Sequence, residues 1–144
     1  MNGREWTAAD LTQIAELERD CFTDPWNRRM LAETFLSGRF FGTLLEEESV
    51  VTAYGGMSIL GDEAEIELIA TSEMYRRCGR GRKIIEDLLA EAQARGVKKV
   101  FLEVRVSNAA AQILYLKSGF RGLYARSRYY PDGEDAIVMC KELG

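Results

Sequence analysis

The chain has 144 residues, of which 47% are hydrophobic and 29% charged, and its formal net charge is −4. This composition is typical of a globular protein and excludes a disordered chain, and the length predicts a single domain over residues 1–144. Because there is no histidine, nucleophiles activated by histidine and the HExxH metal site are excluded, and acid–base chemistry must use Asp, Glu, Tyr, Lys, Cys or water.

The charge and the cysteines also limit the environment and the partners. Cys21, Cys78 and Cys140 have neither disulfide-framework nor zinc spacing, so we expect no metal and a reducing, cytoplasmic location. The acidic balance argues against direct binding of nucleic acid. No apolar run approaches the roughly 18 residues of a membrane span, and the first residues do not resemble a signal peptide. We expect a monomer or a weak dimer.

The first half of the chain predicts a strand or extended segment at the N-terminus, then two helices followed by three strands. Apolar residues recur at helical spacing within residues 7–22, and residues 27–38 predict a second helix with Asn27 as its cap. The three strands are expected at residues 40–45, 50–60 and 64–71, separated by charged turns.

The second half predicts two helices that alternate with strands. Its predicted elements are a helix at 81–96, a strand at 98–105, a helix at 108–120 and a final strand pair at 121–130 and 134–143 around the turn "PDG". The whole order indicates an α/β fold with a mixed sheet covered by helices.

The stretch "RRCGRGR" at residues 76–82 lies between a predicted strand and a predicted helix. Glycines let the backbone approach a ligand closely, arginines add charged donors, and a helix N-terminus presents unpaired N–H groups. This combination favours a phosphate site. It is neither a P-loop nor a dinucleotide fingerprint, because the spacing of both motifs is absent. The alternative is a solvated basic loop.

Two blocks of sequence resemble the GNAT (Gcn5-related) N-acetyltransferases. The pattern R/Q-x-x-G-x-G/A, here Arg76, Gly79 and Gly81, is similar to their coenzyme A pyrophosphate loop, and "LEVRVSNAAAQILYLKSGF" at 102–120 is similar to a later segment. The order of elements resembles that fold over nearly the whole chain. The resemblance implies about seven mostly antiparallel strands flanked by about four helices, and acetyl-CoA as cosubstrate.

The resemblance is most specific to the RimI type of this family. "FTDPW" at 22–26, "LEVRVSNAAA" and the tail "RSRYYPDGEDAIVM" are similar to the bacterial enzymes that acetylate the N-terminal alanine of ribosomal protein 18 of the small subunit. The tail also resembles N-terminal acetyltransferases outside bacteria. The implied partner is the N-terminus of a ribosomal or other protein.

The resemblance also implies the roles of individual residues. Glu103 matches the general base, and Tyr115 matches the acid that protonates the coenzyme thiolate. The positions that match cofactor contacts are Ile69, Ala70, Thr71, Arg76, Arg77, Cys78, Gly79, Arg80, Gly81, Arg82 and Asn108. The first three match a strand edge that pairs with the pantetheine arm, and residues 77–82 match the pyrophosphate loop.

Each role has a simpler alternative. Strand alternation places Glu103 on one face with Phe101 and Arg105, so Glu103 is either a base in an apolar strand or one half of a surface ion pair with Arg105 or a lysine. Tyr115 is either the acid or a packed core residue. Asn108 is also the expected N-cap of the helix that follows, a role compatible with contact to the coenzyme.

Aromatic and acidic residues near two loops are candidates for substrate binding. Trp26, Tyr129 and Tyr130 would wall a peptide groove, or would belong to ordinary packing, and Glu134 would hold a cationic N-terminus, or would lie in a solvated turn. An α-amine is about one-third neutral at physiological pH, whereas a lysine is neutral in about one part in a thousand, which favours N-termini as substrates. The alternatives are acetylation of lysine, polyamines or other small amines, and a coenzyme A sensor or interaction module without activity.

Overall fold

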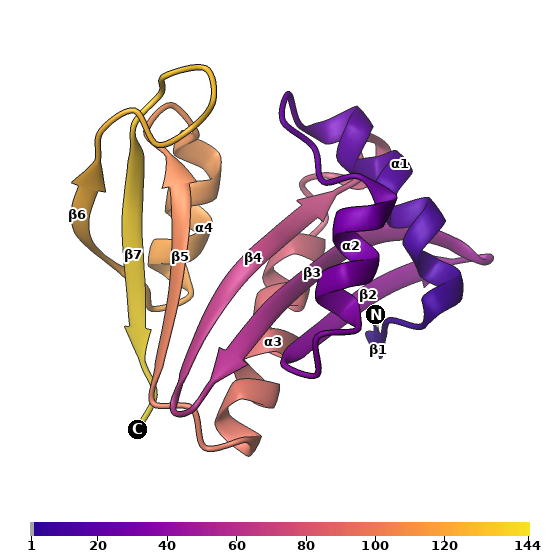
Figure 1. Cartoon of the computed structure of the whole chain (residues 1–144), viewed down its shortest axis with the longest axis horizontal. Coiled ribbons are helices and arrows are strands. Elements are labelled where there is room, and N and C mark those ends of the chain that lie inside the picture. The colour runs from indigo at the N-terminus through magenta and orange to yellow at the C-terminus, as the bar shows by residue number, and fades with distance from the viewer. Residues whose placement is uncertain (1) are drawn as a thin grey trace.

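The computed structural model describes residues 2–144, which form four α-helices, two short 3₁₀ turns and seven strands (Figure 1). The elements are β1 (Arg4–Glu5), η1 (Ala8–Asp10), α1 (Leu11–Cys21), α2 (Arg28–Phe35), β2 (Phe40–Glu47), β3 (Val50–Leu60), β4 (Glu63–Thr71), η2 (Glu73–Tyr75), α3 (Arg80–Ala94), β5 (Lys99–Arg105), α4 (Ala109–Lys117), β6 (Arg121–Arg126) and β7 (Ala136–Glu142).

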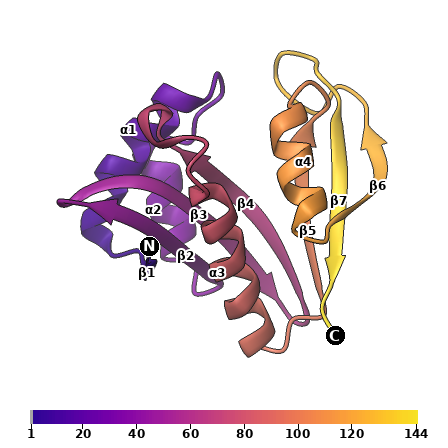
Figure 2. The same cartoon turned by 180° about the vertical axis from the view of Figure 1, so that it is seen from behind.

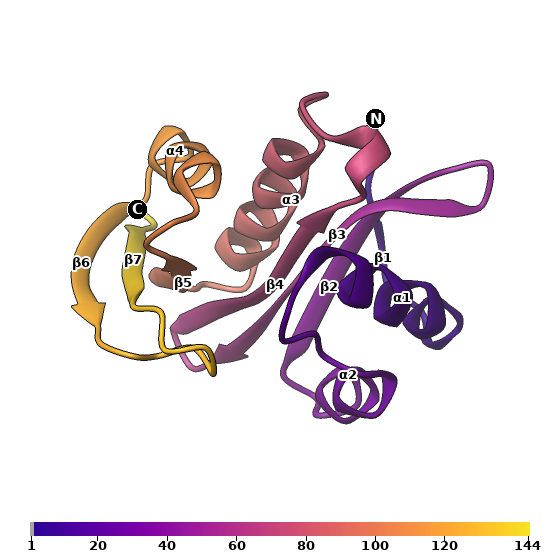
Figure 3. The same ribbon diagram turned by 90° about the horizontal axis from the view of Figure 1, so that it is seen from above.

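The strands form one sheet in the order β1-β2-β3-β4-β5-β7-β6. Every neighbouring pair is antiparallel except β4 and β5, which are parallel. Helices α1 and α2 cover one face of the sheet, and α3 and α4 cover the other (Figure 3). The expected mixed, mostly antiparallel sheet between helices is therefore confirmed.

Two apolar cores hold the helices on the sheet. Ile84, Ile85 and Leu88 of α3 are fully buried against one face, as their helical spacing predicts. On the other face, Ile14 of α1 and Leu31 of α2 are buried with Tyr54 of β3. Because both faces of β3 are covered, its residues 51–57 are all buried, whereas β4 and β5 alternate between buried and more exposed residues.

The pairing between β4 and β5 is short. Its register joins Glu63 to Lys99, Ala64 to Val100 and Glu65 to Phe101, and no further pairs follow. Beyond these residues the two strands diverge, which gives the sheet the V shape visible in Figures 1 and 2. We call this diverging part of β4 and β5 the splay. Within it, β4 keeps β3 as a partner on one side but has no strand partner on the other.

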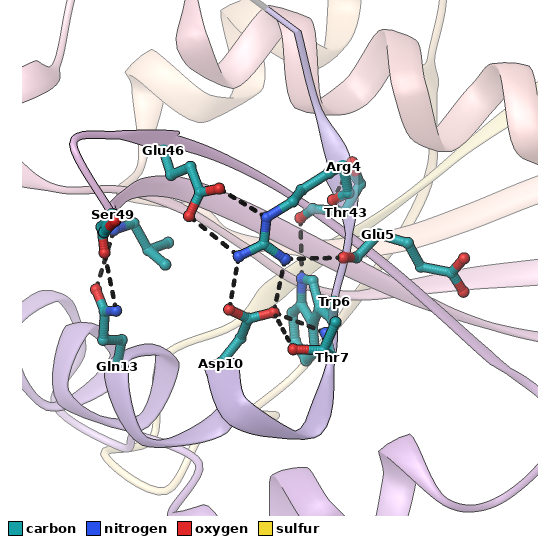
Figure 4. A network of polar contacts seen from close by, with 10 residues as sticks. Arg4, Glu5, Trp6, Thr7, Asp10, Gln13, Thr43, Glu46 and Ser49 are labelled. Carbon is teal, nitrogen blue, oxygen red and sulfur yellow. Dashed lines mark hydrogen bonds and ion pairs between the residues drawn. The ribbon is translucent and has the colours of Figure 1, made fainter.

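A polar network fixes the N-terminal strand to the second strand (Figure 4). The guanidinium of Arg4 donates to both carboxylate oxygens of Asp10 at 2.8 and 2.9 Å, and to Glu46 at 2.8 Å. Asp10 forms a capping box with Thr7 at the start of η1. The indole N–H of Trp6 donates to the Thr43 carbonyl at 2.9 Å. These bonds join β1, η1 and β2 into one unit.

The structure corrects three details of the predicted elements. The first helix begins with a 3₁₀ turn and becomes α-helical at Leu11, and η2 was not predicted at all. The final strands are shorter than expected, because residues 127–135 form a loop closed by the Gly133 N–H on the Tyr130 carbonyl at 2.8 Å. Within residues 2–144, no helix is both long and apolar enough to cross a bilayer.

Candidate functional site

The turn before α3 leaves backbone N–H groups free at the open end of the splay. Gly79 is the N-cap of α3 and has a left-handed φ of 80°, and Arg77 has a φ of 65°. The first helical bond runs from the Lys83 N–H to the Gly79 carbonyl at 3.1 Å. The N–H groups of residues 80–82 therefore have no intrahelical acceptor, and the helix dipole adds partial positive charge there.

The arginine side chains of this turn mostly brace the protein. Arg76 donates to the Thr71 carbonyl at 3.1 Å. Arg80 forms an ion pair with Glu47 and lies 4.8 Å above the ring of Tyr75. Arg82 pairs with a glutamate one helical turn further along α3. What the turn presents to an anion is therefore chiefly its main chain.

Two helices begin side by side at the open end of the splay. A Cβ at Gly81 would lie 3.2 Å from Leu114 Cδ2, a tight contact that would shift the leucine side chain by a few tenths of an ångström, so glycine eases the approach of the first turn of α3 to α4. Asn108 caps α4, and its side-chain oxygen accepts from the Ala111 N–H at 3.1 Å, which confirms the predicted cap. The last three residues of β4, Ile69–Thr71, lie at this same end.

Glu103 lies half-buried on β5, on the face opposite buried Leu102 and Val104, as alternation predicts. Its carboxyl group is within hydrogen-bonding reach of Glu65 on β4. Glu65 as a residue is exposed, but its carboxyl group lies against that of Glu103. Partial burial of the carboxyl and the negative charge of Glu103 raise the pKa of Glu65 to about 7.

Tyr115 belongs to the core. The residue is 6% exposed, and its ring meets that of Phe120 edge-on at 6.0 Å. Its hydroxyl makes no hydrogen bond to the described residues. Burial raises the pKa of Tyr115, so the phenol stays protonated throughout the physiological range.

Arg105 joins the two loops that flank this face of the sheet. Its guanidinium donates to Asp132 at 2.8 Å and Glu134 at 2.9 Å in the β6–β7 loop, and to Asp24 at 3.2 Å in the α1–α2 loop. It also lies 4.0 Å above the ring of Tyr130. Arg105 forms its ion pairs with these three acidic residues, and the alternative ion pair with Glu103 is not formed among the described residues.

The comparisons with known proteins agree with this geometry. The profile of the acetyltransferase (GNAT) family matches residues 11–120. The chain belongs to the GNAT family of acetyltransferases. It is 37% identical to the [ribosomal protein bS18]-alanine N-acetyltransferase of Escherichia coli strain K12, over 90% of this chain and 89% of that protein. It is 36% identical to the N-alpha-acetyltransferase RimI of Mycobacterium tuberculosis, over 96% and 90%.

A solved GNAT structure extends the similarity to three dimensions. The crystal structure of the ribosomal-protein-S18-alanine N-acetyltransferase from Escherichia coli superposes with a TM-score of 0.92 at 34% identity, covering 99% of this chain and 94% of that one. The resemblance inferred from the two sequence blocks is thus confirmed along nearly the whole chain. GNAT enzymes use acetyl-CoA. In the described part of the chain, no group of three or more His, Cys, Asp or Glu side chains is placed to hold a metal ion.

The predicted substrate residues of this GNAT domain flank the same face but differ in their surroundings. Trp26 packs against the α1–α2 core, and its backbone N–H donates to the carboxylate of buried Glu18 at 3.0 Å. Tyr129 and Tyr130 meet edge-on with ring centres 5.1 Å apart. Both oxygens of Glu134 already accept hydrogen bonds, from Arg105 and from the Ser107 N–H. Glu134 therefore holds the β6–β7 loop to the end of β5.

Two residues of the site carry no motif that sequence reasoning used. Glu65 belongs to the alternating stretch "EAEIE", which marks a strand face but does not say which strand lies next to it. Glu18 is buried and accepts from Tyr54 and Trp26, which fixes the α1–α2 loop. Its only signal is a charged residue at a core position of an amphipathic helix.

Cys78, one of the predicted cofactor contacts, lies exposed in the turn, and its Sγ contacts the Arg76 carbonyl at 3.5 Å.

Proposed function

We propose that this protein transfers the acetyl group of acetyl-CoA to the N-terminal α-amine of a protein, and that the N-terminal alanine of ribosomal protein bS18 is its substrate. The observation that carries the proposal is the 37% identity to an enzyme named for that reaction, over about nine-tenths of both chains. Glu103 and Tyr115 would serve as the base and the acid of this reaction.

The open end of the splay fits the cosubstrate. The diphosphate would accept hydrogen bonds from the N–H groups of residues 77–82, because a helix N-terminus with left-handed residues before it forms an anion site. Ile69, Ala70 and Thr71 would offer their free backbone edge to the pantetheine amides. Asn108 would contact the coenzyme from the start of α4. The bound thioester supplies the acetyl group and the leaving thiolate.

The protein's own residues would move the two protons of the reaction. Glu103 is a half-buried carboxylate on the substrate face and would accept the proton that the amine loses. Tyr115 reaches this region from the opposite side of the sheet, and Tyr130 lies near enough to influence its ionisation. The phenol of Tyr115 is neutral throughout the physiological range, so it carries a proton that it would donate to the sulfur as the C–S bond breaks.

The flanking loops would hold the substrate N-terminus. Trp26 comes from the α1–α2 loop, and Tyr129 and Tyr130 come from the β6–β7 loop, so the two loops face the amine from different sides. Glu134 would act through Arg105 by holding its loop in place. The face contains acidic groups and no histidine, which suits an α-amine that is already partly neutral at pH 7 better than lysine.

The test is acetylation of a synthetic peptide with the bS18 N-terminal sequence, followed by fragment mass spectrometry that locates the acetyl group. We expect modification of the α-amine and none of the peptide with a blocked N-terminus. Glu103→Gln should abolish most turnover while coenzyme A still binds in calorimetry. Acetylation only of lysine or of polyamines would replace the proposed substrate, and binding of acetyl-CoA without turnover on any amine would support a sensor instead.

A further inference from the structure

A second carboxyl group adjoins the proposed base at the closed end of the splay. Glu65 is the last residue of β4 that pairs with β5, and its partner is Phe101. Paired residues of parallel strands face the same side, and Glu103 lies two positions beyond Phe101. Glu65 and Glu103 therefore project from the same face, at the point where the two strands part, and their carboxyl groups are within hydrogen-bonding reach.

A hydrogen bond between two carboxyl groups requires a proton. An ionised carboxylate only accepts, so two ionised glutamates repel each other, whereas one protonated partner can donate to the other. Below about pH 7 the pair is therefore expected to hold one proton. The ionisation of Glu65, whose pKa is about 7, agrees with this count.

The charged and titratable neighbours of this pair are few. Arg126 of β6 favours the ionised form of Glu65, while Tyr129 lies near both carboxyl groups. Tyr130 lies near Glu103, and Glu67 follows on β4 and accepts from Ser58. Arg105, the other cation on this face of β5, is occupied by Asp24, Asp132 and Glu134. No described lysine or arginine forms an ion pair with Glu65 or Glu103 within 4 Å.

We propose that Glu65 is a positioning residue for acetyl transfer: it holds one proton against Glu103, so that the pair meets the substrate amine with a single negative charge and one oriented carboxylate. This inference rests on the proposed function. The hydrogen bond from Glu65 fixes the orientation of the Glu103 carboxylate. Because protonated Glu65 is neutral, the pair does not carry two negative charges, which would hold the amine as an unreactive ammonium ion.

The proton count of the reaction closes without another reactant. The C–N bond forms as the C–S bond breaks, the amine loses one proton to the free Glu103 oxygen, and the departing thiolate gains one from Tyr115. Both groups then exchange protons with water. Glu65 keeps its proton throughout, so its contribution is to the charge and orientation of Glu103 and not to the transfer itself.

Glu65→Gln gives a specific test. The amide keeps a donor to Glu103 but cannot ionise, and the fold should tolerate it because the side chain is exposed. We compare the two enzymes by dividing kcat/KM of the wild type by kcat/KM of Glu65→Gln at each pH. The ionisation of the substrate amine affects both values equally and drops out of this ratio. We expect this ratio to fall by about tenfold between pH 6 and pH 8, because the protonated fraction of a group with pKa 7 falls from about nine-tenths to about one-tenth. Glu65→Asp should restore the wild-type profile, and KM for acetyl-CoA should not change.

A second measurement separates this proposal from the proposed function. In carbon-13 NMR of glutamate-labelled protein without substrates, we expect one carboxyl to titrate near pH 7 and to disappear in Glu65→Gln. In Glu103→Gln, the titration midpoint of this Glu65 carboxyl should move down toward the ordinary pKa of a glutamate. A ratio that stays flat with pH, or no carboxyl titrating between pH 6 and 8, overturns the role of Glu65. Failure of the wild type to acetylate any N-terminal peptide overturns the proposed function, and the NMR titration then decides alone whether the pair shares a proton.

Discussion

Replacing Gly79 with alanine separates two properties of the turn before α3, its backbone conformation and its closeness to a ligand. Gly79 has a φ of 80°, and a Cβ built there meets no atom of the protein within 4 Å. The structural cost is therefore that of a non-glycine residue in the left-handed region, about 1–2 kcal/mol. For a chain of this size, that cost lowers the melting temperature by about 2–8 °C.

The same helix offers a matched control. Gly96 follows the C-terminus of α3, has a φ of 77°, and also has nothing within 4 Å of an added Cβ. It ends the helix in a Schellman motif, with the Val97 N–H on the Ala92 carbonyl at 3.0 Å. Gly96→Ala should therefore destabilise the protein by about as much as Gly79→Ala, at the end of α3 that is remote from the turn.

The two variants should differ in coenzyme A binding. If the diphosphate lies on the main chain of residues 77–82, a methyl group at Gly79 obstructs it and weakens at least one charge-assisted hydrogen bond, worth about 1.5–3 kcal/mol. Calorimetry should then show a Kd for coenzyme A raised at least about tenfold by Gly79→Ala, and within about twofold of wild type for Gly96→Ala. Equal affinities in the two variants would refute an anion site at this turn, whatever their melting temperatures.

Three further substitutions test other parts of the structure. Tyr115→Phe should lower kcat by about a hundredfold or more with a melting temperature within about 2 °C of wild type, because the hydroxyl bonds no described residue; an unchanged kcat removes Tyr115 as the acid. Arg105→Met should raise KM for the peptide about tenfold or more and leave the Kd for coenzyme A unchanged, because Arg105 ties only the substrate loops; a parallel loss of both would contradict this. Asp10→Asn should lower the free energy of unfolding at pH 7 by about 1–3 kcal/mol in urea titrations. The Arg4 hydrogen bond lowers the pKa of Asp10, so its contribution is complete above about pH 4 and is lost as pH falls through the lower folded pKa; an unaltered acid slope in the variant would exclude this pair.

Local pattern was sufficient for most elements of this fold. The apolar spacing predicts a helix at 81–96, and the structure has α3 at Arg80–Ala94 with Ile84, Ile85, Leu88 and Ala92 buried. Helical and strand periods are properties of neighbouring positions, so a single sequence displays them. The final strands were predicted too long, because the residues at 127–135 carry strand-forming tyrosines but bend into a loop held by turn hydrogen bonds.

The arrangement of side chains in the site was much less predictable. The turn at 76–82 was recognised for its arginines, yet Arg80 points to Glu47, 33 positions away. Arg105 was placed on the correct face, but one of its partners, Asp24, is 81 positions away. The Glu65–Glu103 pair depends on the register of β4 against β5 and on where their pairing stops. None of these long-range contacts leaves a local trace in the sequence.

The two ends of the splay differ in charge, and under the proposed function this difference would let an acidic protein recruit an anionic cosubstrate. The free N–H groups of the α3 turn follow the last residue of β4, whereas Glu65 lies six positions earlier, about 20 Å along the strand. Under the proposed function, a diphosphate would be attracted to the first end and a cationic amine to the second, and each would be repelled by the other's site. The net charge of −4 is an average over these two regions and does not govern either one. If the two substrates bind as proposed, the position of charge along β4 would orient them before any contact specific to either substrate is made.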